Sequence, residues 1–307
     1  MKQSLKVLTI GNSFTDSLSV FWQQVVESAG CELHFERANH GGCELHRHWE
    51  YISNEERDRV YRMYQNYTAK MREILAREPW DIVTIQQASH FSWRPETMQP
   101  FAGYIYDYVK KHAPQAEVVI QQTWAYRADD PRIRPGGVWE ISEWFSESCR
   151  ERGITVQPGM YHIDQTGMYD ALTAAYRKLA RELNCRIIPT GYAVQLARKA
   201  QEGLFPNYDP ELLHTLRWPD LPPQASEFVG NIWWAKNPET GEMELRRDTI
   251  HLNARGQYLQ ACVWFAMLYG RPTSEIAFVP DMIGNCDAAF LRETAQKAVD
   301  EFKQEKQ

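Results

Sequence analysis

Two short, almost continuous runs of β-branched residues constrain the fold of this chain more than any other feature. Residues 82–85 read Ile-Val-Thr-Ile, and residues 117–120 read Glu-Val-Val-Ile. Such runs are typical of strands buried on both faces, as in a parallel sheet covered by helices. A helical pattern over Thr97–His112 separates them. This part of the chain therefore predicts a strand–helix–strand unit.

The same alternation extends through most of the 307 residues. Strands are predicted at Leu5–Ile10, Glu32–Arg37, Ile82–Gln87, Glu117–Thr123 and Cys185–Pro189. Helices are predicted at Ser17–Ser28, Asn54–Arg77, Thr97–His112, Met168–Leu183 and Ala254–Leu268. We therefore expect one α/β domain over residues 1–307, a flavodoxin-like three-layer α/β/α fold with a parallel sheet of about five strands. A last helix at about 288–302 is expected to pack outside the sheet.

Two long segments, Trp124–Gly137 and residues 204–247, interrupt this rhythm and are rich in aromatic residues and prolines. Long loops in compact domains are usually functional or disordered, and many aromatic residues argue against disorder. We expect the second segment to cover a site at the carboxyl ends of the strands. The first segment also contains arginines that could hold a carboxylate or sulfate on an acidic sugar. These arginines are Arg127, Arg132 and Arg134, and the aromatic candidates for substrate contact are Trp124, Tyr126, Trp233 and Trp234, with plain loop packing as the alternative.

Composition narrows the classes of partner. The formal net charge is −6 and no basic block stands out, which argues against nucleic acid. Eleven Trp and fifteen Tyr would suit either a Trp-rich core or a sugar-binding cleft. The longest apolar stretch, Ala261–Tyr269, is too short to span a bilayer, and a strand pattern from Leu5 leaves no room for a signal peptide. We expect a cytoplasmic protein with reduced cysteines that acts on a small-molecule or oligosaccharide substrate.

Gly11-Asn12-Ser13 follows the first predicted strand directly. A serine at such a strand-to-helix turn can act as a nucleophile, although many serines in this position only cap the helix. Its candidate partners lie in Asp248-Thr249-Ile250-His251. An acid three residues before a histidine can accept from Nδ1–H and leave Nε2 facing a serine, whereas the simpler interpretation is a solvated turn.

In this chain order the segments resemble the SGNH hydrolases, also called the GDSL esterase/lipase family. The resemblance implies a metal-free serine ester hydrolase that needs no cofactor, with Ser13 as nucleophile, His251 as base and Asp248 as its partner. The family's second block, Asn-x-Gly, is matched by Asn39-His40-Gly41. It implies that the N–H groups of Gly41 and Ser13 bind the oxyanion.

The family's third block, Gly-x-Asn-Asp, is missing, and the chain instead has Gln86-Gln87-Ala88-Ser89-His90. His90 or Gln87 could supply the side-chain donor of the oxyanion hole. This variant resembles a subgroup of mostly uncharacterised bacterial SGNH proteins often associated with glycan use, which implies a carbohydrate O-acetylesterase. A carbohydrate-binding pseudoenzyme is the alternative that the altered block favours.

A cluster of potential metal ligands offers a third hypothesis, a metal-dependent hydrolase. His40, Cys43, His46 and His48 fall within nine residues, a composition that would suit zinc. If the segment is extended, His46 and His48 face the same way. Structural zinc sites normally pair two separated doublets, however, and the sequence has no second one. We therefore expect this segment to form a wall of the active site.

Overall fold

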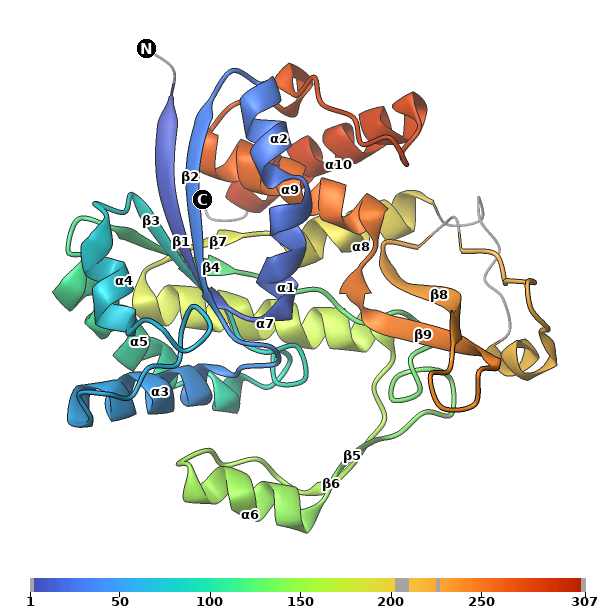
Figure 1. The fold of residues 1–307 in the computed structure, drawn as a ribbon, viewed down its shortest axis with the longest axis horizontal. Helices are drawn as coiled ribbons and strands as arrows, with labels where there is room; N and C mark the ends of the chain where they lie inside the picture. Colours follow the sequence, from blue (N-terminus) through green and yellow to red (C-terminus); the bar gives the residue numbers. More distant parts are fainter. Residues whose placement is uncertain (1–2, 202–209, 225–226, 305–307) are drawn as a thin grey trace.

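The computed structural model describes residues 3–201, 210–224 and 227–304. Its centre is a five-stranded sheet in the order β2-β1-β3-β4-β7, with every neighbouring pair parallel (Figure 1). The strands are β1 (Ser4–Gly11), β2 (Glu32–Asn39), β3 (Ile82–Ile85), β4 (Glu117–Gln121) and β7 (Arg186–Ile188). All residues of β3 are buried, as their β-branched sequence predicts. The predicted fold class and the five strands are confirmed.

Helices cover both faces of the sheet (Figure 1). On one face lie α2 (Trp22–Ser28), α8 (Thr190–Ala200), α9 (Ala254–Tyr269) and α10 (Asn285–Gln304). On the other lie α3 (Leu45–Arg57), α4 (Met71–Arg77), α5 (Phe101–His112) and α7 (Gln165–Leu183). Helix α9 is buried along almost its whole length because α10 packs on its outer side, which explains its nearly uniform apolar sequence.

Two helix predictions need correction. The single helix expected at Asn54–Arg77 is two helices, α3 and α4, and α3 begins nine residues earlier, at Leu45. Gln65, Asn66 and Tyr67, which lie between them, all have positive φ and cannot continue a helix. The range expected as one helix, Ser17–Ser28, is a 3₁₀ turn (Ser17–Val20) followed by α2, and a short helix, α1 (Ser13–Asp16), precedes it.

The predicted insertion at 204–247 is not a plain loop. A 3₁₀ turn covers Pro210–Thr215, and a hairpin of β8 (Val229–Lys236) and β9 (Met243–Leu252) leads into α9. Residues 204–209 and 225–226 of this segment lie outside the described residues.

A second insertion forms a small unit that extends from the lower side of the molecule in Figure 1. It consists of β5 (Trp139–Ile141), α6 (Glu143–Glu151) and β6 (Gly159–Tyr161), with β5 and β6 paired antiparallel. Across the described ranges, no helix combines the length and apolar character needed to span a bilayer.

Candidate active site

Ser13 opens the short helix α1 immediately behind β1. The cap of this helix is Asn12, whose side-chain oxygen accepts from the Phe14 N–H at 3.1 Å. The Asn12 amide also donates to the Cys43 carbonyl at 3.0 Å and accepts from Gln86 at 2.5 Å. Because Asn12 performs the capping role, the Ser13 hydroxyl is available for chemistry.

The structure brings Ser13, His251 and Asp248 into one hydrogen-bonded line. Ser13 Oγ lies 2.9 Å from His251 Nε2, and His251 Nδ1 lies 2.7 Å from Asp248 Oδ2. The carboxylate fixes the tautomer with hydrogen on Nδ1, so Nε2 can accept the serine proton. Such an arrangement can generate a serine nucleophile.

The second oxygen of Asp248 is also held. Asp248 Oδ1 accepts from the backbone N–H groups of Ile250 at 2.8 Å and of His251 at 3.0 Å. Partial burial would raise the pKa of Asp248, but hydrogen bonds from the His251 ring and from these backbone groups outweigh it and lower the pKa to about 2. The residue is therefore a carboxylate at neutral pH.

Asp248 lies near the end of β9, and Gly230 in a bulge of β8 lies against it. Gly230 has φ of +83°, and a Cβ there would lie 2.3 Å from the Asp248 carbonyl oxygen. Only glycine allows β8 to approach this closely.

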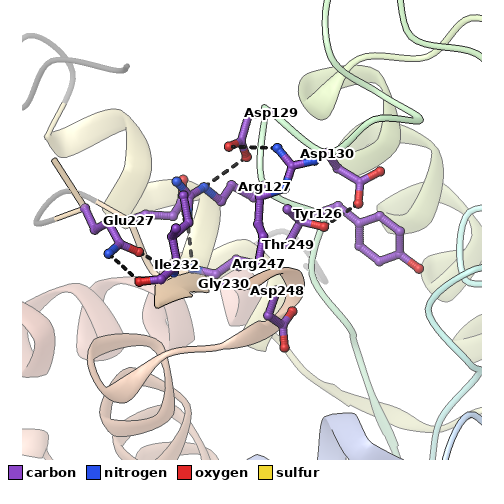
Figure 2. Close-up of polar contacts among 12 residues, drawn as sticks. Tyr126, Arg127, Asp129, Asp130, Glu227, Gly230, Ile232, Arg247, Asp248 and Thr249 are labelled. Atoms are coloured by element: carbon purple, nitrogen blue, oxygen red, sulfur yellow. Dashed lines mark hydrogen bonds and ion pairs between the residues drawn. The ribbon is translucent and has the colours of Figure 1, made fainter. Parts of the chain in front are cut away.

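The loop after β4 packs against the segment that carries the acid and the base (Figure 2). The Arg127 N–H donates to the Thr249 carbonyl at 3.0 Å, and Thr249 Oγ1 donates to Asp130 Oδ2 at 2.6 Å. Arg127 also forms an ion pair with Asp129 at 2.9 Å. Through these contacts the loop fixes the residue next to Asp248.

A cavity of about 350 Å³ opens beside the triad. Its volume suits a small ligand. Its apolar side chains are few, namely Phe14, Ala88 and Ile250. The other lining residues are Asn12, Ser13, Gly42, Ser89, His90, Tyr126, Arg132 and His251. The cavity therefore combines several polar groups with a short apolar surface to which the Tyr126 ring also contributes.

His90 and Gln87, the two predicted side-chain oxyanion donors, occupy different environments. His90 lines the cavity, and its Nε2 lies 3.0 Å from Glu44 Oε1. Burial alone would raise the pKa of Glu44, but the hydrogen bond and the charge of His90, together with Arg47, lower it to about 2. Glu44 is thus a carboxylate that orients the His90 ring.

Gln87 is completely buried and its amide is engaged elsewhere. Its nitrogen donates to the Thr97 carbonyl at 2.9 Å and to Thr97 Oγ1 at 3.2 Å. Its oxygen accepts from the backbone of Leu45 and Ala88. The structure therefore gives Gln87 a role in holding the loop backbone, and it leaves His90 as the side-chain candidate.

The predicted backbone donor, Gly41, is exposed, and its carbonyl accepts from Arg47 at 3.4 Å. Its neighbour Gly42, with φ of +60°, is the residue of this turn that lines the cavity. The N–H role of Gly41 stays a prediction.

The four aromatic residues predicted to contact substrate do not gather at the cavity. Trp124 is fully buried behind Phe14, and its indole donates to the Ile250 carbonyl at 2.8 Å. Tyr126 lines the cavity, with its hydroxyl 2.8 Å from Ser89 Oγ. Trp233 and Trp234 lie on β8 and are absent from the cavity lining. Trp124 is thus a packing residue, because the loop folds inward after β4.

The proposed zinc ligands do not converge. His46 and His48 lie on α3, not on an extended segment, so their side chains leave the helix in different directions. His48 donates to the Gly11 carbonyl at 2.9 Å and accepts from the Tyr64 hydroxyl at 3.0 Å, while His40 is hydrogen-bonded to the Met63 carbonyl. Burial raises the pKa of Cys43 to about 12, which disfavours the thiolate. Over the described parts of the chain, no three His, Cys, Asp or Glu side chains are grouped to hold a metal ion.

The parallel sheet, the serine behind β1 and the Asp-x-x-His segment before α9 lie together in the arrangement that the resemblance to the SGNH hydrolases implies. Residues 6–133 match the model of the DUF4886 family, which is described as a domain of unknown function. A comparison with curated proteins found no match.

This fold is shared with one solved structure, and two further solved structures are similar at lower TM-scores. A DUF4886 family protein from Bacteroides uniformis is 21% identical, with a TM-score of 0.66 over 97% of this chain and 95% of that one. A member of the lipolytic protein G-D-S-L family from Veillonella parvula is 13% identical, with a TM-score of 0.37 over 86% and 98% of the two chains. Phospholipase A1 from Streptomyces albidoflavus is 12% identical, with a TM-score of 0.37 over 82% and 94%.

Proposed function

We propose that this protein hydrolyses ester bonds through an acyl-enzyme on Ser13. Ser13 Oγ attacks the carbonyl carbon as its proton passes to His251 Nε2, and a tetrahedral oxyanion forms. The C–O bond to the alcohol then breaks, and His251 returns the proton to the leaving oxygen. Water repeats the sequence on the acyl-serine and releases the acid.

The observation that carries this proposal is the 2.9 Å approach of Ser13 Oγ to His251 Nε2 at the edge of a cavity. A general base must lie within hydrogen-bond reach of the proton that it abstracts. Asp248 supports the imidazolium that forms during the attack. An aligned triad beside an open cavity favours the enzyme over the pseudoenzyme hypothesis.

The lining of the cavity supports a short acyl group and a hydroxylated alcohol, and we propose an acetylated carbohydrate. A lipid acyl chain would need a long apolar channel, whereas this cavity is only about 350 Å³ and its apolar side chains are Phe14, Ala88 and Ile250 with the ring of Tyr126. Hydroxyl and imidazole groups on the other walls can hydrogen-bond to sugar hydroxyls.

Hydrolysis of 4-nitrophenyl acetate tests the mechanism. Ser13→Ala should lower kcat on the order of 10⁴-fold, because the covalent route is lost. Ser19→Ala is the matched control, since Ser19 is exposed, does not line the cavity, donates to the Asp16 carbonyl and accepts from Arg37 at 3.4 Å. Equal rates for wild type and Ser13→Ala would refute the nucleophile. Mass spectrometry of acetylated oligosaccharides against long-chain esters tests the substrate class, and preferred release of long acyl chains would contradict it.

A further inference from the structure

We propose that Arg132 binds a carboxylate of the substrate, so that the ester hydrolysed at Ser13 belongs to an acidic sugar. This inference rests on the proposed function and specifies its substrate. Three features of Arg132 carry it: its place in the cavity, the way its guanidinium is held, and its connection to the triad.

Arg132 lines the same cavity as Ser13 and His251. Among the described residues that form this lining, it is the one with a permanent charge, and none is a carboxylic acid. In a small cavity with low-dielectric walls, such a charge selects ligands of the opposite sign. A neutral sugar would form no charge-assisted hydrogen bond with this guanidinium.

The guanidinium is held in a fixed orientation. Its Nε and Nη2 donate to Asp130 Oδ1 and Oδ2 at 2.8 and 2.7 Å. The guanidinium carbon lies 4.5 Å from the ring centre of Tyr126 and 4.9 Å from that of Trp139. The Arg132 side chain is nevertheless 38% exposed, whereas that of Asp130 is 1% exposed. The ion pair with Asp130 uses the Nε edge of the guanidinium, so Nη1 lies outside that pair and can face a ligand. Because the side chain is already ordered before a ligand binds, it loses little conformational entropy on binding.

Asp130 connects this cation to the catalytic segment. One of its oxygens, Oδ2, accepts both from Arg132 Nη2 and from Thr249 Oγ1. Burial alone would raise the pKa of Asp130, but these hydrogen bonds lower it. Because Thr249 follows Asp248 in the chain, Arg132 has a defined position relative to the triad. A carboxylate on Arg132 would therefore orient the ester toward Ser13.

The charge balance favours a carboxylate over a phosphate. Asp130 neutralises much of the Arg132 charge, and its buried carboxylate would repel a dianion more strongly than a monoanion. A planar carboxylate also matches the planar edge of a guanidinium.

The other two arginines of this loop do not compete for the role. Arg127 is buried and paired with Asp129, and Arg134 pairs with Glu211. Neither lines the cavity. Arg134 therefore provides a matched control from the same loop.

Acetate release from two pairs of monoacetylated sugars tests the inference. The pairs are glucuronate with glucose and galacturonate with galactose, each acetylated at the same hydroxyl. Wild type should show kcat/KM about tenfold or more higher on the uronate of at least one pair, as a charge-assisted hydrogen bond can provide. Arg132→Gln should bring this ratio close to one, Arg132→Lys should give an intermediate ratio, and Arg134→Gln should keep the wild-type ratio. A wild-type ratio near one for both pairs, or an unchanged ratio in Arg132→Gln, would overturn the inference.

Binding separates this inference from the proposed chemistry. Calorimetric titration of Ser13→Ala with both uronates and with their carboxamides should show about tenfold or more tighter binding of one acid than of its amide. This difference in affinity should vanish in the double variant that carries Ser13→Ala and Arg132→Gln. Equal binding of acids and amides, or tighter binding of glucose 6-phosphate than of either uronate, would overturn it. If Ser13-dependent ester hydrolysis alone fails, the proposed function is refuted. The comparison of acids with amides still tests whether Arg132 binds a carboxylate.

Discussion

The indole of Trp124 lies flat against the ring of Phe14, with centroids 4.2 Å apart and planes within 2°. The same indole donates to the Ile250 carbonyl at 2.8 Å. Phe14 follows the nucleophile and Ile250 precedes His251, so one buried side chain contacts both catalytic segments. Ser13 and His251 are 238 residues apart in sequence, and Trp124 helps to keep them within hydrogen-bond reach.

Replacement of Trp124 should therefore lower kcat more than it changes KM. Trp124→Phe keeps an aromatic ring beside Phe14 but removes the donor to Ile250, and the unpaired carbonyl should reduce stability by about 1–2 kcal/mol. We expect kcat for 4-nitrophenyl acetate to fall roughly tenfold or more, because small displacements of catalytic groups are costly. Steady-state kinetics and thermal unfolding measure the two effects.

Trp80→Phe is the control for this experiment. Trp80 is also fully buried, and its indole donates to the Ile74 carbonyl at 3.0 Å, next to the start of β3. Its loss should reduce stability and leave kcat unchanged. Equal kcat values in Trp80→Phe and Trp124→Phe would show that Trp124 does not align the triad.

The sheet was predictable because its signals are local. The β-branched runs identify buried strands such as β3 by themselves, and the parallel order follows from the alternation with helices. The triad needed two further short signals, the serine behind β1 and the spacing of Asp248 and His251. Each of these segments can be interpreted without knowing what packs against it.

The errors concern residues whose role depends on distant partners. The start of α3 at Leu45 was missed because the cluster of histidines suggested ligands, whereas His48 is fixed by Gly11 and Tyr64. The polar amide of Gln87 satisfies backbone groups of α3 and of the loop near Thr97, which no local pattern indicates. The hairpin β8–β9 was hidden by its charged and proline-rich surroundings.

Substitution of His90 tests its role in the oxyanion hole. If the imidazole donates to the oxyanion, His90→Ala should lower kcat roughly 10²-fold or more with little change in KM, because the interaction exists only in the transition state. Glu44 pairs with His90, so Glu44→Gln should lower kcat less. Retention of wild-type kcat in His90→Ala would exclude the ring as a donor.

Whereas His90→Ala should lower kcat, Gln87→Ala should lower stability and leave kcat unchanged. This change leaves the Leu45 N–H and the Thr97 carbonyl without their partner in a fully buried place, which should cost about 2 kcal/mol or more of unfolding free energy. Activity per folded molecule should persist. A stable Gln87→Ala protein with greatly reduced kcat would instead make Gln87 a participant in catalysis.

Chelation separates the serine mechanism from metal catalysis. Activity toward 4-nitrophenyl acetate should be unchanged after prolonged incubation with a chelator, because His40, Cys43, His46 and His48 have separate partners and surroundings. Elemental analysis of the purified protein provides the second measurement. Stoichiometric zinc whose removal abolishes turnover would contradict the serine mechanism.

The Asp248–His251 pair gives a mutation with a large expected effect. Asp248→Asn keeps the size of the side chain, but the amide can donate to Nδ1 and favour the wrong tautomer of His251. We expect kcat to fall on the order of 10³–10⁴-fold with KM nearly unchanged. Steady-state kinetics on an acetyl ester check this, and a fall of less than about tenfold would show that His251 does not need Asp248 for its orientation.

The acid limb of the pH profile should reflect a single proton. Hydrogen bonds that outweigh the effect of burial lower the pKa of Asp248 from 3.8 to about 2, so it stays charged throughout the range in which the enzyme is assayed. Activity should fall with decreasing pH, because a general base must be in its neutral form to accept the Ser13 proton. Log kcat/KM, measured between about pH 4 and 9, should rise with a slope of one to a plateau. A slope of two would show that a second proton controls the activity.

The stability that the Asp248 carboxylate contributes is fully present above its unfolded pKa of 3.8 and is lost as pH falls through about 2. The stability difference between wild type and Asp248→Asn should therefore narrow only in that acid range.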